Sequence, residues 1–264
     1  MSEPNYVFSS AAERHEWERL SVLQEEFDPG TYRRLGRLGV GPGWVCLEVG
    51  PGAGSVMNWL CDRVGETGRV VAVDLEPRFV ANTHRPNLEI RRADIGTDEL
   101  ESGRFDLVHV RCVLMHVPQR TRALANIVRA LKPGGWLLVE EPDFSTTQPS
   151  EGTGTGADAL ARVFQATRAL YGSIGIDTIL GRRLPPLLTD LGLAGVDTEG
   201  ELAVTRGGTR RAKIWRLAVQ HLGERLLATG QATATDISQF LQRMNHPNTW
   251  FLDYVLVAAW GQRP

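Results

Sequence analysis

The stretch LEVGPGAGS, which runs from Leu47 to Ser55, decides the fold class because it places a glycine at every second position between an apolar run and a helical pattern. Gly50, Gly52 and Gly54 have no Cβ, so the chain can turn sharply out of a strand and a ligand can touch the backbone. A dinucleotide site prefers the spacing G-x-G-x-x-G, in which the last glycine comes one residue later. The glycine spacing alone is therefore weak evidence for any one ligand.

Predicted strands and helices alternate around this loop. Strand patterns cover 44–49, 69–74, 87–94, 105–110 and 136–140, and helical patterns cover 54–64 and the segment that begins at Pro118 and ends at KPGG, 132–135. Repeated βα units with short apolar strands imply a parallel sheet covered by helices on both faces. We therefore expect an α/β, Rossmann-like, doubly wound domain whose ligand binds beyond the carboxyl ends of the strands.

The segments that flank this core are less regular. Ser9 or Ser10 can cap a first helix that DPG at 28–30 stops, and a second short helix ends at GVGPG, 39–43. After Glu140 we expect a flexible loop at 145–156, helices at 157–170, 177–191, 210–228 and 235–244, and strands at 196–204 and 250–259. These later segments fit either a cap over the ligand edge or extra core packing.

Composition excludes several functional classes. Apolar residues make up 42% and charged residues 23% of the chain, which is typical of a folded globular protein. A formal net charge of −2 offers no large positive surface for nucleic acid or anionic lipid, so a small-molecule partner is expected. No apolar run approaches the roughly 18 residues of a membrane span. Three cysteines, Cys46, Cys61 and Cys112, stand in apolar stretches and indicate reduced thiols in a cytoplasmic protein.

Acidic residues stand beside the glycine loop and at the ends of the next two strands. A carboxylate of Glu48 pointed into the loop would repel a pyrophosphate and suit a cationic ligand. Asp74, 24 positions after Gly50, can accept both hydroxyl hydrogens of a ribose. Asp94 can accept an adenine amino proton while Ile95 packs on the ring. Either aspartate can instead cap a helix.

The series resembles the class I S-adenosylmethionine-dependent methyltransferases. LEVGPGAGS looks like their first motif, VVAVDLEP their second-strand acidic motif, RRADI their adenine-contacting motif, and LKPGGWLLVEEP the approach to their fifth strand. The resemblance is close over 44–142, and the chain is most similar to actinobacterial small-molecule methyltransferases of the ubiquinone-methyltransferase-like group.

This resemblance implies a single methyltransferase domain over 1–264 that binds S-adenosyl-L-methionine. Its parts would be an N-terminal helical lid at 1–40, a cofactor-binding half at 44–142, substrate-cap insertions around a sheet strand at 143–249, and a last strand at 250–264. The sheet would have seven strands, the last one antiparallel and beside the fifth. The cofactor-binding residues would be Tyr6, Glu48, Gly50, Gly52, Ser55, Asp74, Leu75, Asp94, Ile95, Arg111 and Cys112, with Arg14 as a further candidate in the lid.

The candidate catalytic residues follow the fourth and fifth strands. His116 is the first choice for a base or an acceptor-orienting group, although a histidine there could equally hold the loop. Glu141 and Asp143 come next, and capping the following turn is their alternative role. His246 could enter the site from the cap, whereas His109 lies inside a strand and is expected to be packed. Asp143 and His246 lack a recognisable metal-ligand spacing, so no metal site is predicted.

The expected reaction is in-line methyl transfer to O, N or C of a small, largely apolar or aromatic molecule such as a secondary metabolite. Six aromatic residues could line an apolar chamber, although core packing is the better prediction for any one of them: Tyr6, Trp17, Phe144, Tyr171, Trp250 and Phe251. RCVLM follows the fourth strand in place of the N/D-P-P-Y/F motif of nucleic-acid methyltransferases. Two alternatives stay open, a nicotinamide-dependent oxidoreductase and a cyclase that keeps the cofactor as a scaffold and transfers no methyl group.

Overall fold

The computed structural model describes residues 8, 13–150 and 157–264. The chain divides into two compact units. The sheet unit comprises residues 27–141, 180–200 and 257–264, and the helical unit comprises the described residues of 1–26 and 142–179 together with 201–256.

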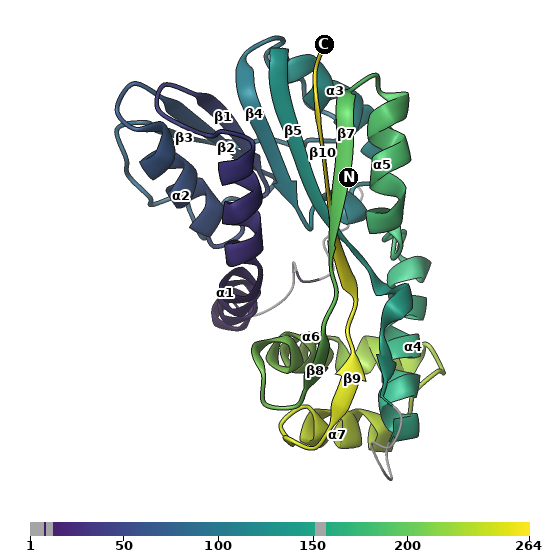
Figure 1. Ribbon diagram of the computed structural model, residues 1–264. Coiled ribbons are helices and arrows are strands. Elements are labelled where there is room, and N and C mark those ends of the chain that lie inside the picture. The colour runs from purple at the N-terminus through teal and green to yellow at the C-terminus, as the bar shows by residue number, and fades with distance from the viewer. Residues whose placement is uncertain (1–7, 9–12, 151–156) are drawn as a thin grey trace. The chain divides into compact units, whose positions relative to one another are not determined.

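The seven-stranded sheet has the order β3-β2-β1-β4-β5-β10-β7 (Figure 1). Its strands are β1 (Val45–Val49), β2 (Arg69–Asp74), β3 (Leu88–Arg92), β4 (Phe105–Arg111), β5 (Leu131–Asp143), β7 (Ala194–Glu201) and β10 (Val255–Gln262). The first five pair in parallel. β10 runs antiparallel to β5, since Gly134 N–H donates to Arg263 O and Arg263 N–H donates to Gly135 O. The predicted fold class and the antiparallel strand beside the fifth are confirmed.

Helices cover both faces of this sheet. The sheet unit contains α2 (Ser55–Val64), α3 (Arg120–Ala130), α5 (Leu180–Asp190) and the later turns of α1 (Glu13–Arg37). Figure 1 shows α2 and the later turns of α1 on one side of the sheet and α3 and α5 on the other. Because side chains alternate along a strand, every second residue faces α1 and α2. That core includes Cys46, Leu107 and Leu138, together with Met57 and Leu60 of α2.

The prediction of two N-terminal helices is wrong, because α1 continues without a break through DPG from Glu13 to Arg37. A proline inside a helix removes one backbone hydrogen bond and crowds the preceding turn. Here the continuous helix is supported by side-chain bonds on either side of Pro29. Asp28 is bonded to Ser55 and Arg111, and Thr31 is bonded to Glu140.

Two predicted strands are each divided in the structure. The pattern at 196–204 becomes β7 and β8 (Val204–Arg206), and the pattern at 250–259 becomes β9 (Trp250–Leu252) and β10. β8 and β9 belong to a separate antiparallel sheet of order β6-β9-β8, with β6 at Gln148–Pro149. Alternating hydrophobicity specifies a strand but not the sheet to which it belongs.

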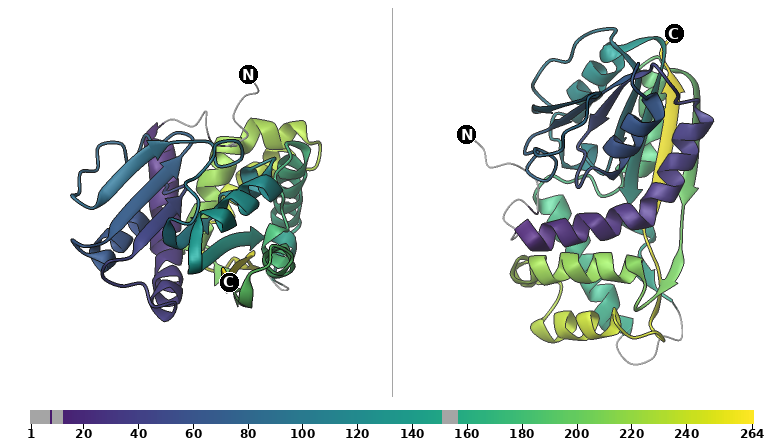
Figure 2. Two further views of the ribbon diagram at one scale, coloured as in Figure 1. Left: turned by 90° about the horizontal axis from the view of Figure 1, so that it is seen from above. Right: turned by 90° about the vertical axis from the view of Figure 1, so that its left-hand side faces the viewer.

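The helical unit is built on an aromatic core. Its helices are α4 (Ala157–Ser173), α6 (Arg210–Ala228) and α7 (Ala234–Arg243), which pack on one another (Figure 2). The rings of Phe164, Trp215 and Phe240 meet edge to face, the geometry that the ring quadrupoles favour. No helix within the described ranges is long and apolar enough to cross a membrane.

Candidate functional site

The glycine loop joins β1 to α2 at the carboxyl edge of the sheet. Gly50, Gly52 and Gly54 have φ values of 68°, 57° and 91°, which L-residues with a Cβ rarely adopt. A Cβ built on Gly50 would overlap Cγ2 of Val113 in the loop after β4. The glycine loop and the loop after β4 are therefore so close at Gly50 that a side chain at this position would collide with Val113.

Two aspartates stand at the carboxyl ends of neighbouring strands. Oδ1 of Asp74 accepts a hydrogen bond of 2.8 Å from the backbone N–H of Glu76, and Oδ1 of Asp94 accepts one of 2.8 Å from Gly96. Within the described part of the chain, the second carboxylate oxygen of each has no hydrogen-bond donor. Burial raises the pKa of Asp74. Each aspartate thus fixes its own turn with one oxygen, and its other oxygen accepts from no donor of the described chain.

Glu141 holds the loop after β4. Its carboxylate is fully buried and accepts hydrogen bonds from the backbone N–H groups of Val113 and Leu114 at 2.9 and 2.7 Å, and a longer one of 3.4 Å from Met115. Burial raises the pKa of Glu141 to about 8 despite these donors. These contacts give Glu141 a positioning role for the short 3-10 helix η1 (Leu114–His116).

Two predicted site residues lie in this same loop. Cys112 is the only residue other than glycine with a positive φ, 56°, among those the structure describes. Such a conformation stores strain and is concentrated at functional sites. Cys112 is partly exposed, although it stands in an apolar stretch of the sequence, whereas Cys46 and Cys61 are buried. His116 ends η1, so its position is set by the backbone that Glu141 holds.

Glu48 belongs to a row of buried charged side chains on one face of the sheet, which we call the charge row. Its members on the strands are Glu48 of β1, His109 of β4 and Glu140 of β5. Nδ1 of His109 lies 2.7 Å from a carboxylate oxygen of Glu48, and Nε2 lies 3.2 Å from Glu140. Burial disfavours the charged imidazole, but the two carboxylates outweigh it and raise the pKa of His109 to about 9. The carboxylate of Glu48 therefore binds an imidazolium inside the sheet unit, and His109 is packed as expected.

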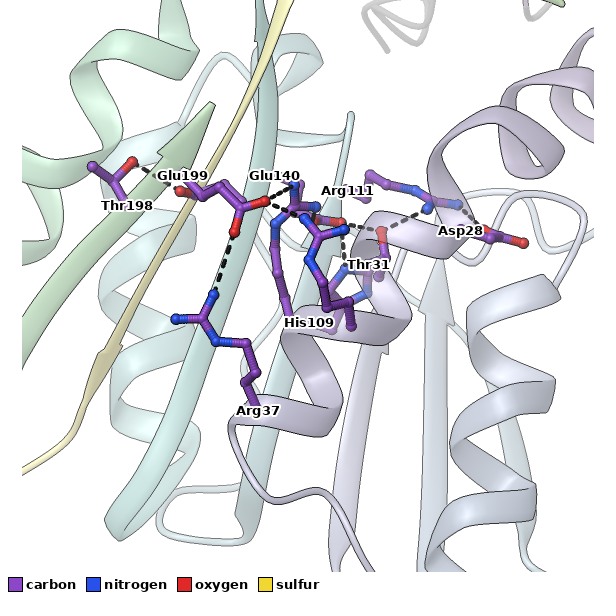
Figure 3. Close-up of polar contacts among 11 residues, drawn as sticks. Asp28, Thr31, Arg37, His109, Arg111, Glu140, Thr198 and Glu199 are labelled. Atoms are coloured by element: carbon purple, nitrogen blue, oxygen red, sulfur yellow. Dashed lines mark hydrogen bonds and ion pairs between the residues drawn. The ribbon is translucent and has the colours of Figure 1, made fainter. Parts of the chain in front are cut away.

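Thr31 and Arg34 of α1 extend the charge row to Arg111, which ends β4, and to Glu199 of β7 (Figure 3). Arg34 donates to Glu140 at 2.6 Å and to Glu199 of β7 at 3.2 Å. Thr31 donates to Glu140 at 2.5 Å and accepts from Arg111 at 2.8 Å. The contacts of Thr31 and Arg34 were not predicted from the sequence. Polar residues spaced three apart at 28, 31 and 34, next to the apolar positions of a helix, were the available signal.

Other predicted residues have less specific surroundings. Ser55 donates to Asp28 at 3.0 Å, Leu75 is exposed, and Ile95 is buried. Tyr6 lies outside the described residues. In the helical unit, Arg14 and His246 are exposed, and Asp143 accepts from the backbone N–H of Ser145 at 2.9 Å. No group of three or more His, Cys, Asp or Glu side chains among the described residues is arranged to hold a metal ion.

The aromatic candidates divide into two groups. Phe144, Tyr171 and Phe251 are buried in the aromatic core of the helical unit, whereas Trp17 and Trp250 are exposed. The three buried rings contribute to packing.

Comparison with known proteins agrees with this arrangement. The family model of the methyltransferase domain matches residues 47–139, the span from the glycine loop through β5. The chain is 37% identical over 121 residues to the ubiquinone/menaquinone biosynthesis C-methyltransferase UbiE of Hydrogenovibrio crunogenus, which covers 42% of this chain and 46% of that protein. Residues 47–139 of the chain therefore form a methyltransferase domain.

Two further similarities extend beyond the methyltransferase domain. Methyltransferase str2 of Strobilurus tenacellus is 27% identical over 184 residues, 67% of this chain and 63% of that protein. The chain thus spans less than two thirds of the length of each of these relatives. Among solved structures, the [4+2]-cyclase SpnF superposes with a TM-score of 0.53 at 18% identity, over 91% of this chain and 82% of that one. This last similarity concerns the fold alone.

Proposed function

We propose that this chain is an enzyme that binds S-adenosyl-L-methionine at the carboxyl edge of its sheet and transfers the methyl group to a small, largely apolar or aromatic acceptor. The observation that carries the proposal is the pair of aspartates at the ends of β2 and β3, each with one carboxylate oxygen directed to no donor of the described chain. The UbiE-like relative is named for quinone biosynthesis, which supports a ring-containing acceptor such as a secondary metabolite.

The residues of the site fit this cofactor. Asp74 would accept hydrogen bonds from the ribose hydroxyls, and Asp94 with Ile95 would hold the adenine. Gly50 and Gly52 would admit the ligand to the backbone. When bound, the cofactor supplies an electrophilic methyl group, and no protein nucleophile is required. The remaining task of the protein is to orient the acceptor against that methyl group and to exclude water.

We propose that His116 orients the acceptor or removes its proton, with Glu141 fixing the loop on which His116 stands. General acid–base catalysis typically contributes about a hundredfold or more. Replacing His116 with asparagine should therefore lower kcat about a hundredfold while the KM for the cofactor stays within a factor of about three. A matched loss in kcat and in cofactor affinity would instead give His116 only a structural role.

The cofactor proposal is tested directly by calorimetry with S-adenosylmethionine and S-adenosylhomocysteine. Asp74→Asn keeps an oxygen that can accept from Glu76 N–H but replaces one acceptor by a donor. We expect this variant to weaken binding of both ligands about thirtyfold, because an ionic hydrogen bond contributes about 2 kcal/mol. Glu76→Gln, an exposed change in the same loop, is the control and should leave both affinities unaltered. Wild-type protein that binds neither ligand would rule the proposal out.

The acceptor class needs a separate experiment. Indole, phenolic and polyketide molecules would be incubated with isotopically labelled cofactor, and methylated product and S-adenosylhomocysteine would be measured together. Label transferred only to protein or RNA would contradict a small-molecule acceptor. Conversion of a substrate without release of S-adenosylhomocysteine would indicate the scaffold alternative, which the similarity of the fold to a [4+2]-cyclase keeps open.

A further inference from the structure

A buried arginine stands at the edge where the cofactor is proposed to bind. Arg111 ends β4, directly after Val110, which is paired in register with Val49 before the glycine loop. A guanidinium remains protonated under all ordinary conditions. An unpaired cation at this position would repel a sulfonium, since like charges in a partly buried site interact over several ångströms.

Asp28 of α1 forms an ion pair with this arginine. Its Oδ1 lies 2.8 Å from a guanidinium nitrogen of Arg111, with side chains 13% and 7% exposed respectively. The same oxygen accepts from the hydroxyl of Ser55 at 3.0 Å, and Oδ2 accepts from Tyr32 at 3.0 Å. Figure 3 shows the guanidinium of Arg111 directed toward Asp28 and Thr31 on α1.

Among the described residues, Asp28 is the carboxylate that lies in direct ion-pair contact with this arginine. Glu140 also acts electrostatically on Arg111, but the contacts of its carboxylate are with Arg34 at 2.6 Å and His109 at 3.2 Å. Glu48 is 2.7 Å from the same imidazole. The acids of this row are thus Asp28, Glu48, Glu140 and Glu199, and its bases are Arg111, His109 and Arg34. Removal of Asp28 leaves the guanidinium of Arg111 without a carboxylate in direct contact, and an uncompensated buried charge is costly.

We propose that Asp28 is a positioning and specificity-determining residue that neutralises Arg111, so that the site accepts a cationic sulfonium nucleoside as readily as its uncharged thioether product. This inference rests on the proposed function. Through its bond to Ser55, the first residue of α2, the same carboxylate also ties the end of the glycine loop to the end of β4.

The test compares the affinities of S-adenosylmethionine and S-adenosylhomocysteine, measured by calorimetry on the full chain. The two ligands differ at the sulfur, which carries a positive charge only in the first. Asp28→Asn should weaken the binding of S-adenosylmethionine about tenfold more than the binding of S-adenosylhomocysteine, because Arg111 becomes an uncompensated cation. Arg111→Met should shift the ratio in the opposite direction, because Asp28 is then an uncompensated anion. The double variant should restore the wild-type ratio.

Controls separate charge from structure. Tyr32→Phe removes a hydrogen bond to Asp28 without a change of charge, and Asp62→Asn makes the same chemical change in an exposed ion pair with Arg85. Both should keep the wild-type ratio. The inference would be overturned if Asp28→Asn weakened the binding of both ligands equally. It would also be overturned if Arg111→Met left the ratio of the two affinities unchanged, and this second measurement can be made even if Asp28→Asn does not fold. Failure of the wild-type protein to bind either ligand would instead overturn the proposed function.

Discussion

Replacing Gly50 with alanine is expected to lower the free energy of unfolding by about 3 kcal/mol and to abolish measurable cofactor binding. Two separate costs contribute. A non-glycine residue held at a φ of 68° costs about 1 kcal/mol. The new Cβ would also overlap Cγ2 of Val113, and overpacking of a close contact costs about 2 kcal/mol. Urea unfolding and calorimetry would measure the two effects.

Two further variants separate these costs. Gly103 has a similar φ of 64°, and no atom lies within 4 Å of the position that a Cβ would take there, so Gly103→Ala should show the conformational cost alone, about 1 kcal/mol. Val113→Ala in the Gly50→Ala background should recover most of the steric cost. If Gly50→Ala were no less stable than Gly103→Ala, the close approach of the two loops would not exist in solution.

The site residues that could be predicted from the sequence are those that stand at or just after the carboxyl end of a strand, because the strand itself fixes their place in the fold. Gly50 follows β1, Asp74 ends β2 and Asp94 stands two residues after β3, and the carboxyl ends of parallel strands share one edge of the sheet. Their local chemistry could also be anticipated. Asp74 and Asp94 were expected either to bind a ligand or to cap a helix. In the structure one oxygen of each closes a turn, and the other has no donor among the described residues.

The part that the sequence did not predict depends on contacts between distant segments. DPG at 28–30 has the composition of a helix stop. The contacts of Asp28 with Ser55 and Arg111, and of Thr31 with Glu140, support the helix that continues through it. Glu141 was assigned to catalysis or capping, and its role in holding η1 requires the register of β5 beside β4. Local patterns carry no information on such pairings.

His109 is expected to make the stability of the sheet unit depend on pH. In the folded chain its pKa is about 9, against an ordinary value of 6.5. A group whose pKa is raised by folding contributes its full stabilisation below the unfolded pKa and loses it as the pH rises through the folded pKa. The contribution of His109 is therefore complete below pH 6.5 and disappears near pH 9, with a total change of about 3 kcal/mol.

The effect is measured as the difference between wild-type protein and His109→Gln in urea unfolding from pH 5 to 10. Glutamine leaves two buried carboxylates with no cation between them, so we expect a loss of about 3 kcal/mol at pH 7 that shrinks toward pH 9. The difference is the informative quantity because Glu141, whose pKa is raised to about 8, also lowers the stability of both proteins between pH 4.5 and 8. Adding Glu48→Gln to His109→Gln removes one of the two facing carboxylates and should recover part of the loss at pH 7. A difference that stays constant across this range would mean that His109 is neutral in the folded chain, and the charge row would then lack its central cation.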